Sequence, residues 1–236
     1  IALGVEQKLL PAAVVNQAAR DRAARLEQQL GYKPGRKQMR EIKDNIVSEL
    51  LPRAFSRYRT TFAWIDPAAG WLVIDSTNPQ KAEEVVEVLK RSIDDFPFAV
   101  LRTKMTPVAA MSEWLSAGDG PAGFGIDREC ELKSPLEEKP TVRYARHPLD
   151  TPEVRNHIVA GKLPTRLALT WRDRISFVLT DRLEVKRLVL LDVTQAETGN
   201  DAKTDDDRFD ADFTLMTGEL ARFLGELVEA LGGLEK

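Results

Sequence analysis

The spacing of hydrophobic residues changes along the chain, and this change limits the possible folds more than any other feature. After Gly123, apolar and polar residues alternate in FGIDRECELKS, PTVRYAR, TRLALTWRDRISFVLTD and VKRLVLLDV, which is typical of antiparallel strands. Before Gly123, several segments instead carry apolar residues three or four positions apart, as on one face of a helix. We therefore predict an α+β fold of antiparallel sheets with packed helices.

Two helices are expected near the start of the chain. KLLPAAVVNQAARDRAARLEQQLG has helical spacing, with Pro11 in its first turn and Gly31 at its end. QMREIKDNIVSELLPRAF has the same spacing as far as Pro52, which would end or kink the helix. The basic turn YKPGRKQ joins them, so we predict a projecting basic helical hairpin.

The middle of the chain mixes strands and helices. FAWI and WLVI flank the turn DPAAG and predict a β-hairpin. Asn78 is placed to cap the next helix, NPQKAEEVVEVLKRSI. We also expect a strand at FAVLRTK and a short helix at PVAAMSEWLSAG.

The remaining part contains two more helices. TPEVRNHIVAG should begin at a Thr151 cap, and FTLMTGELARFLGELVEALGG is amphipathic. Between the last strand and the final helix, ETGNDAKTDDDR reads as an acidic polar loop. The changes in pattern suggest three segments: a basic helical segment at 1–60, an α+β subdomain at 61–122 and a β-rich subdomain at 123–236.

Positive charge is concentrated in residues 20–59, although the net charge of the chain is −3. This segment holds eleven basic and five acidic residues, a local balance of +6. Because a surface field depends on local charge, the segment predicts an anionic partner such as DNA, whereas ordinary solvated helix faces are the alternative. Its basic residues are Arg20, Arg22, Arg25, Lys33, Arg36, Lys37, Arg40, Lys43, Arg53, Arg57 and Arg59.

The stretch LLPRAFSRYR places arginines and aromatic residues where two elements join. Arg53 and Arg57 would share one face if the helix continued through Pro52, and we interpret them as phosphate contacts. Phe55 has two possible roles, packing in the core of its own subunit or a contact across a subunit junction. Burial is the commoner fate of a phenylalanine.

Catalytic and metal-binding patterns are weak. Cys130 is the only cysteine, so it cannot form an internal disulfide, and we expect an inert thiol in a cytoplasmic protein. His147 and His157 lack the spacing of a zinc site or a catalytic dyad. The acidic run does not match a calcium loop, and GPAGFG lacks the context of a phosphate loop. That run comprises Asp205, Asp206, Asp207, Asp210 and Asp212.

Several long segments together resemble one family, the recombination-associated protein RdgC. They are LLPRAFSR, WIDPAAGWLVID, KAEEVVEVLKRSI, NHIVAGKLPTRLAL and RFDADFTLMTGELARFLGELVEALGG. The resemblance extends from about Leu9 to Gly233. The family has a further N-terminal portion, so we expect part of the first domain to be missing from this chain.

The resemblance implies a bacterial, nucleoid-associated protein that binds duplex DNA with little sequence preference. It also implies a ring-shaped homodimer that surrounds the duplex and restrains a RecA-type recombinase. Single-stranded DNA is a further possible ligand. No catalytic residue, cofactor, metal or membrane is expected.

Candidate dimer contacts come from three places: Phe55, the basic stretch VRYARH with Arg146 and His147, and Leu220 and Phe223 of the final helix. VRYARH, which also contains Arg143, could close the ring against the PRAFSR joint of the other subunit, or its arginines could be ordinary solvated residues. The final helix could cover a sheet or meet its twin. Two other functions stay open, a metal-dependent nuclease that uses the acidic run and a scaffold that binds an acidic protein.

Overall fold

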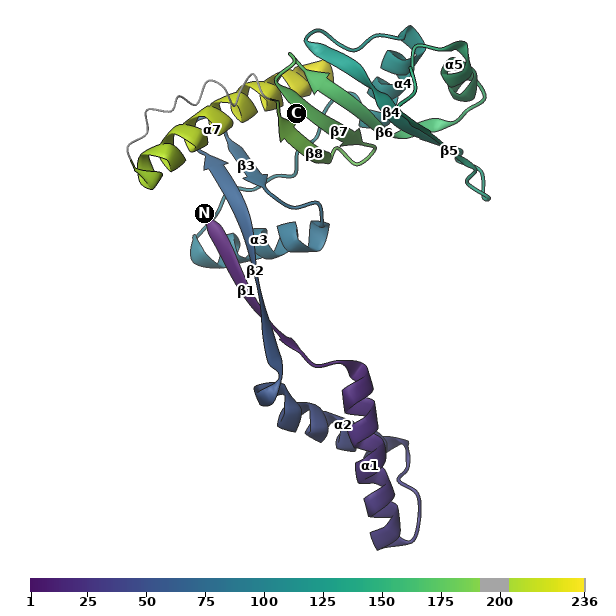
Figure 1. Cartoon of the computed structure of the whole chain (residues 1–236), viewed down its shortest axis with the longest axis vertical. Helices are drawn as coiled ribbons and strands as arrows, with labels where there is room; N and C mark the ends of the chain where they lie inside the picture. Colours follow the sequence, from purple (N-terminus) through teal and green to yellow (C-terminus); the bar gives the residue numbers. More distant parts are fainter. Residues whose placement is uncertain (192–203, 236) are drawn as a thin grey trace. The chain divides into compact units, whose positions relative to one another are not determined.

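The computed structural model describes residues 1–191 and 204–235, which form six α-helices and two antiparallel sheets (Figure 1). The chain divides into two compact units, Ile1–Asp95 and Phe96–Lys236. The sequence had suggested three segments instead. The boundary that it placed after residue 60 falls inside strand β2 (Phe55–Asp66). The α+β class is confirmed.

The first unit contains a three-stranded sheet in the order β1-β2-β3, with β1 at Ala2–Leu9 and β3 at Trp71–Ile74. Leu9 pairs with Phe55 at one end of β1, while β3 pairs with Ala63–Asp66 at the far end of β2. β1 and β2 therefore form a two-stranded ribbon. Figure 1 shows helices α1 and α2 at one end of this ribbon and β3 at the other.

The turn and cap expected in the first unit are confirmed. Asp66 Oδ1 accepts hydrogen bonds from the Ala68 and Ala69 amides, both at 3.0 Å, in the β2–β3 turn. Asn78 Oδ1 accepts the Gln80 amide at 3.0 Å and starts helix α3 at Pro79–Ser92. These local bonds follow from the side-chain chemistry of Asp and Asn, which explains why sequence reasoning found them.

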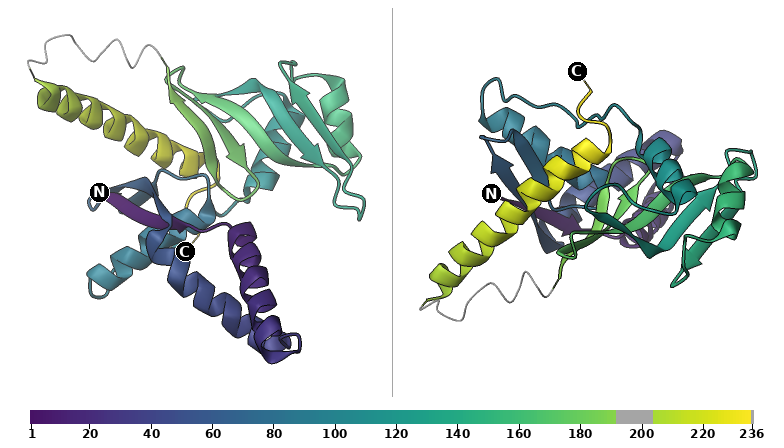
Figure 2. Two further views of the ribbon diagram at one scale, coloured as in Figure 1. Left: turned by 60° about the horizontal axis from the view of Figure 1, so that its bottom comes forward. Right: turned by 90° about the horizontal axis from the view of Figure 1, so that it is seen from above.

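The second unit has a five-stranded sheet in the order β5-β4-β6-β7-β8, and its described residues also form three α-helices. Helix α7 contributes Phe223 to the core. The centroid of its ring lies 4.8 Å from the ring centroid of Phe177 and 5.9 Å from that of Trp171. Figure 2 shows the first part of α7 extending beyond this sheet. The elements are α4 (Pro107–Ala117), β4 (Phe124–Lys133), β5 (Thr141–Ala145), α5 (Pro152–Val159), β6 (Leu163–Trp171), β7 (Ile175–Thr180), β8 (Val185–Leu190) and α7 (Asp205–Ala230).

Three local expectations for the second unit are wrong. FAVLRTK is not a strand, because only Thr103 forms a bridge, to Leu234. The hydroxyl of Thr151 does not cap α5; it is buried without a hydrogen-bond partner. Helix α7 begins at Asp205 rather than Phe213, so the end of the expected acidic loop is helical. Residues 197–203 of that loop lie outside the described residues.

Candidate nucleic-acid interface

The basic hairpin is built from α1 (Ala12–Leu30) and α2 (Arg36–Leu50), which are joined by a short turn. Gly31 closes α1 with φ of 76°, a left-handed conformation that glycine adopts without strain. The two helices pack through a small core of Ala19, Ala23, Ile42 and Ile46. Because this core uses short side chains on α1, most of the hairpin surface remains available to charged residues.

Basic residues of α2 form a stripe beside the buried face. Arg36, Arg40 and Lys43 are spaced four and three residues apart, so they lie along one side of the helix. Arg36 and Arg40 are exposed, and Lys43 is half-buried. The stripe extends over about 10 Å along the helix axis, at 1.5 Å per residue. A phosphate backbone can contact such a line of cations without any readout of base sequence.

Most cations of residues 20–59 form no ion pair with a residue that the structure describes. In the first unit, all of which is described, only Arg22 and Arg59 of the eleven form ion pairs, with Glu49 and Glu84 respectively. Of the remaining nine, all except Lys43 are exposed. Their charges repel one another and are not neutralised internally, so the segment can attract an external polyanion.

The α-helix does not continue through the joint after α2, which corrects the expected geometry of its arginines. α2 ends at Leu50, a short 3₁₀ helix covers Leu51–Arg53, and β2 starts at Phe55. Pro52 has no amide hydrogen to extend the α-helix. Arg53 and Arg57 therefore do not share a helical face, although both remain exposed and unpaired.

Phe55 is 86% exposed, which excludes the first of its two possible roles, packing in the core of its own subunit, and leaves the subunit contact as a prediction. Tyr58 is 74% exposed and Phe62 59% exposed on the same strand. Phe62 was not singled out by sequence reasoning, which placed it only in the apolar run FAWI of the expected hairpin. Tyr58, Thr60 and Phe62 occupy alternate positions and therefore share one side of β2, and this period-two pattern is the signal that would have grouped Phe62 with Tyr58.

The second basic stretch is mostly engaged within its own unit. Arg143 forms an ion pair with Glu131, which lowers the pKa of that carboxyl below its ordinary value. His147 lies against Tyr144, with ring centroids 5.2 Å apart. Arg146 is exposed in a left-handed conformation with φ of 58°. Of this stretch, Arg146 is the side chain best placed to contact another molecule.

The final helix resolves one of the alternatives left open by the sequence. Phe223 is fully buried and Leu220 packs against the same core, so this part of α7 covers its own sheet. Phe223 has no exposed surface left for a second subunit, which corrects its assignment as a direct dimer contact. The exposed dimer candidates are Phe55 and Arg146, and His147 is half-buried.

Chemistry other than binding finds little support in the described residues. Burial raises the pKa of Cys130 to about 12, which agrees with an inert thiol. Within residues 1–191 and 204–235, no group of three or more His, Cys, Asp or Glu residues is arranged to hold a metal ion. Throughout the same ranges, no helix has the length and apolarity needed to cross a membrane.

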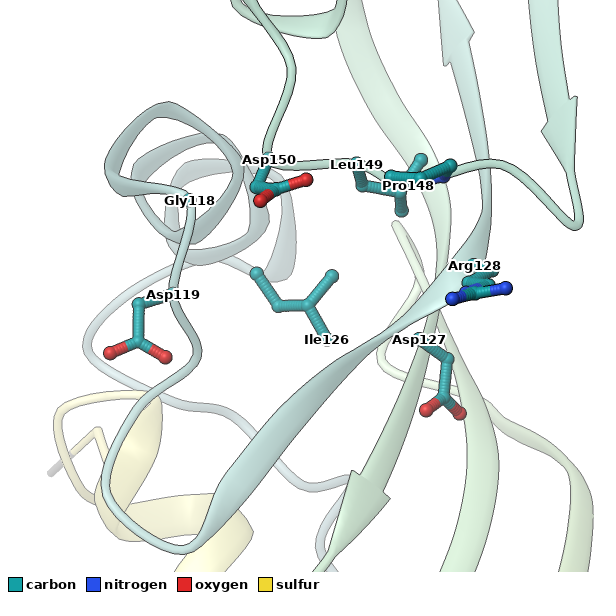
Figure 3. Close-up of a pocket in the computed structure, with 8 residues that line it drawn as sticks. All are labelled: Gly118, Asp119, Ile126, Asp127, Arg128, Pro148, Leu149 and Asp150. Carbon is teal, nitrogen blue, oxygen red and sulfur yellow. The ribbon is translucent and has the colours of Figure 1, made fainter.

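One polar hollow of about 390 Å³ lies in the second unit (Figure 3). The carboxylates of Asp119, Asp127 and Asp150 lie apart around Ile126 rather than converging on one point. Arg128 is at its margin. The hollow therefore lacks the clustered ligands of a two-metal nuclease site, whose ions lie about 4 Å apart.

Comparison with known proteins identifies the family of the chain. Residues 1–234 match the family model described as "Putative exonuclease, RdgC". The chain belongs to the RdgC family. Its RdgC relatives include the recombination-associated protein RdgC of Dechloromonas aromatica, 56% identical over 99% of this chain and 78% of that protein. The RdgC proteins of Cupriavidus pinatubonensis and Herminiimonas arsenicoxydans are 56% and 53% identical, over 100% and 98% of this chain and 79% and 77% of their own lengths.

Proposed function

We propose that this recombination-associated protein binds DNA without sequence preference through residues 20–59. The observation that carries the proposal is the set of nine cations in this segment that form no ion pair with any residue the structure describes. Cations that neutralise phosphates release condensed counterions, and this release provides most of the affinity of non-specific DNA binding. The segment needs no base-reading motif for this role.

The proposal includes a homodimeric ring around duplex DNA that restrains a RecA-type recombinase in the nucleoid. The family membership supports a role in recombination, and the resemblance implies the ring. Phe55 supports a subunit contact, because a phenylalanine with 86% of its surface exposed has an apolar side chain available to a partner. Arg146 and His147 are the second set of proposed contacts.

Encirclement is tested by loading the full-length protein on circular duplex DNA, open linear DNA and linear DNA with blocked ends, and then raising the salt. A closed ring slides off open ends but stays linked to the circular and blocked forms. A surface patch held only by counterion release dissociates alike from all three. Equal retention on the three forms would therefore contradict the ring while leaving DNA binding intact.

A nuclease is the second candidate, because the matched family model is described as a putative exonuclease. The first turn of α7 contains Asp205, Asp206 and Asp207. Negative charge at a helix N-terminus interacts favourably with the helix dipole, which gives these carboxylates a structural role. Incubation of end-labelled DNA with the protein and Mg²⁺ or Mn²⁺ separates the two candidates. We expect shifted but uncut DNA, whereas metal-dependent release of nucleotides would establish the nuclease.

A further inference from the structure

The α1–α2 hairpin is held together mainly by its own small core. Its hydrophobic cluster has four buried and five partly buried members, and all of them lie on α1 or α2. The hairpin joins the rest of the first unit at the Leu9–Phe55 end of the β1–β2 ribbon, whereas β3 pairs with β2 at Ala63–Asp66, near the other end (Figure 1). Because a two-stranded ribbon is only marginally stable, the hairpin depends on its internal contacts to stay closed.

Like charges crowd the first half of α2 and oppose its folding. Arg40 lies four residues after Arg36. It also lies three residues from Lys37 and three from Lys43, so it has three like-charged neighbours on the helix surface. None of these four cations forms an ion pair with a described residue. Like charges at these spacings destabilise a helix.

The N-terminus of α2 adds a second unfavourable interaction. Its first turn contains Arg36 and Lys37 but no acidic residue, and Gly35 at the N-cap has no side chain that could accept a hydrogen bond. The N-terminus of a helix carries a partial positive charge, so cations in the first turn are disfavoured. Negative charge supplied from outside would relieve both this interaction and the repulsion along the helix.

Ion pairing between the two helices compensates little of this repulsion. Among the described residues, Arg22 and Glu49 form the one ion pair that joins α1 to α2, at 2.9 Å. Both side chains are more than half exposed, and exposed pairs of this kind contribute little to stability. The hairpin therefore combines a small core with a large uncompensated positive charge.

We propose that the α1–α2 hairpin is ordered by its anionic ligand. Repulsion among the unpaired cations keeps an open form of the hairpin populated, and DNA phosphates shift the population to the closed, packed form. This inference rests on the proposed DNA-binding function and adds a conformational step to it. A ligand that binds the closed form stabilises that form by mass action, so ordering of the hairpin and DNA binding are coupled.

The coupling predicts opposite effects of salt on the hairpin and on its complex with DNA. Salt screens the repulsion between exposed cations, so it should close the hairpin when DNA is absent. The same salt weakens the binding of DNA, because it reduces the gain from counterion release. A hairpin that is fully closed without a ligand would show the second effect but not the first.

The test is amide hydrogen exchange of the full chain, followed by mass spectrometry, because exchange reports local opening. Without DNA, salt is raised from about 0.01 M to about 1 M, which shortens the Debye length from about 30 Å to about 3 Å. Amides of α1 and α2 should then exchange at least about threefold more slowly, as expected from the loss of several like-charge repulsions. Duplex DNA at the lower salt should slow the same amides. Amides of β6 and β7, two mostly buried strands of the second unit, are the reference and should not respond.

Two variants carry the same type of substitution but should act in opposite directions. Arg36→Gln/Arg40→Gln should slow exchange of the hairpin about fivefold at the lower salt, because it removes three like-charged pairs, and it should weaken the response to salt. Glutamine has nearly the helix propensity of arginine, so the change is chiefly one of charge. Arg22→Gln is the matched control, because it removes a paired cation of the same hairpin and should not slow exchange.

The outcomes separate this inference from the proposed function. Hairpin exchange that is independent of salt in the absence of DNA would overturn the coupling, even in a chain that binds DNA. Faster exchange in Arg36→Gln/Arg40→Gln would overturn it as well. Salt-dependent exchange in a chain that does not bind DNA would instead overturn the proposed function, and with it DNA as the ordering ligand.

Discussion

The basic segment at residues 20–59 and the contact between α7 and its sheet both use arginine, but they use it differently. Glu219 on α7 is fully buried and pairs with Arg174 at 3.0 Å and with Arg222. Glu226, about two turns further along the helix, accepts a hydrogen bond from Trp171 Nε1 at 2.8 Å and pairs with Arg172. In the basic segment, by contrast, nine of eleven cations have no acidic partner among residues 1–191 and 204–235.

This difference separates charge that stabilises the fold from charge that is available to a ligand. Removing an arginine from a buried carboxylate takes away part of the charge compensation of that carboxylate, so such an arginine is committed to the fold. Unpaired surface cations add nothing to the fold and repel one another. We therefore expect variants of the α7 contact to change stability and variants of the basic segment to change DNA affinity.

The two regions also differ in the size of their cores. The fully buried part of the hairpin core consists of two alanines on α1 and two isoleucines on α2, whereas the second unit buries Trp171, Phe177 and Phe223 together. Aromatic side chains bury the most apolar area per residue, so the second unit has the larger hydrophobic stabilisation. A small core is sufficient for a hairpin whose role is to present a charged surface.

The largest expected effect is in the core of the second unit. Phe223→Ala should lower its free energy of unfolding by about 3–5 kcal/mol, because it removes a buried ring and leaves a cavity. Urea denaturation followed by tryptophan fluorescence measures this loss. A loss below about 1 kcal/mol would mean that Phe223 is not a core residue, and the comparison of the two cores would fail.

A pair of arginine variants sharpens the comparison of charges. Arg174→Met should cost about 3 kcal/mol of unfolding free energy, because buried Glu219 loses a partner. Arg22→Met is the matched variant in the hairpin, where the Arg22–Glu49 pair is more than half exposed, and it should cost less than about 1 kcal/mol. Equal losses in urea denaturation would show that the two ion pairs do not differ as proposed.

A smaller change in stability is expected at low pH. The pKa values of Glu131 and Glu184 in the second unit are lowered, chiefly by hydrogen bonds from Arg143 and Lys186 respectively. A lowered folded-state pKa gives stability that is present above the ordinary pKa of 4.5 and is lost as the pH falls through the folded-state value. The urea midpoint should therefore decrease below pH 4.5, and Glu131→Gln should reduce that decrease. A midpoint independent of pH in this range would contradict the assignment.

Sequence patterns predicted the elements that depend on local chemistry. The β2–β3 hairpin, the Asn78 cap and the alternating strands after Gly123 all follow from neighbouring residues, and the structure confirms them. The concentration of positive charge at residues 20–59 was also visible from composition. These features need no knowledge of distant contacts.

The sequence could not predict features that depend on distant partners. Phe55 and Arg57 are in a strand because β1, more than forty residues earlier, pairs with them. FAVLRTK has strand composition but no neighbouring strand, so it stays irregular apart from one bridge. The lack of ion pairs among the nine cations, and the uncovered face with Tyr58 and Phe62, likewise depend on what the fold places nearby.

The most direct test of the account is the salt dependence of DNA affinity. For the full chain, the slope of log K against log salt should decrease in magnitude by about 1.8 in Arg53→Ala/Arg57→Ala, at about 0.9 per lost phosphate contact. The loss of affinity should be the same for unrelated DNA sequences. Arg143→Ala/Arg187→Ala is the control, because both arginines are exposed but paired with glutamates, and its slope should match the unmodified chain. Equal slopes for the Arg53/Arg57 variant and the unmodified chain would contradict the claim that unpaired cations of this segment contact DNA.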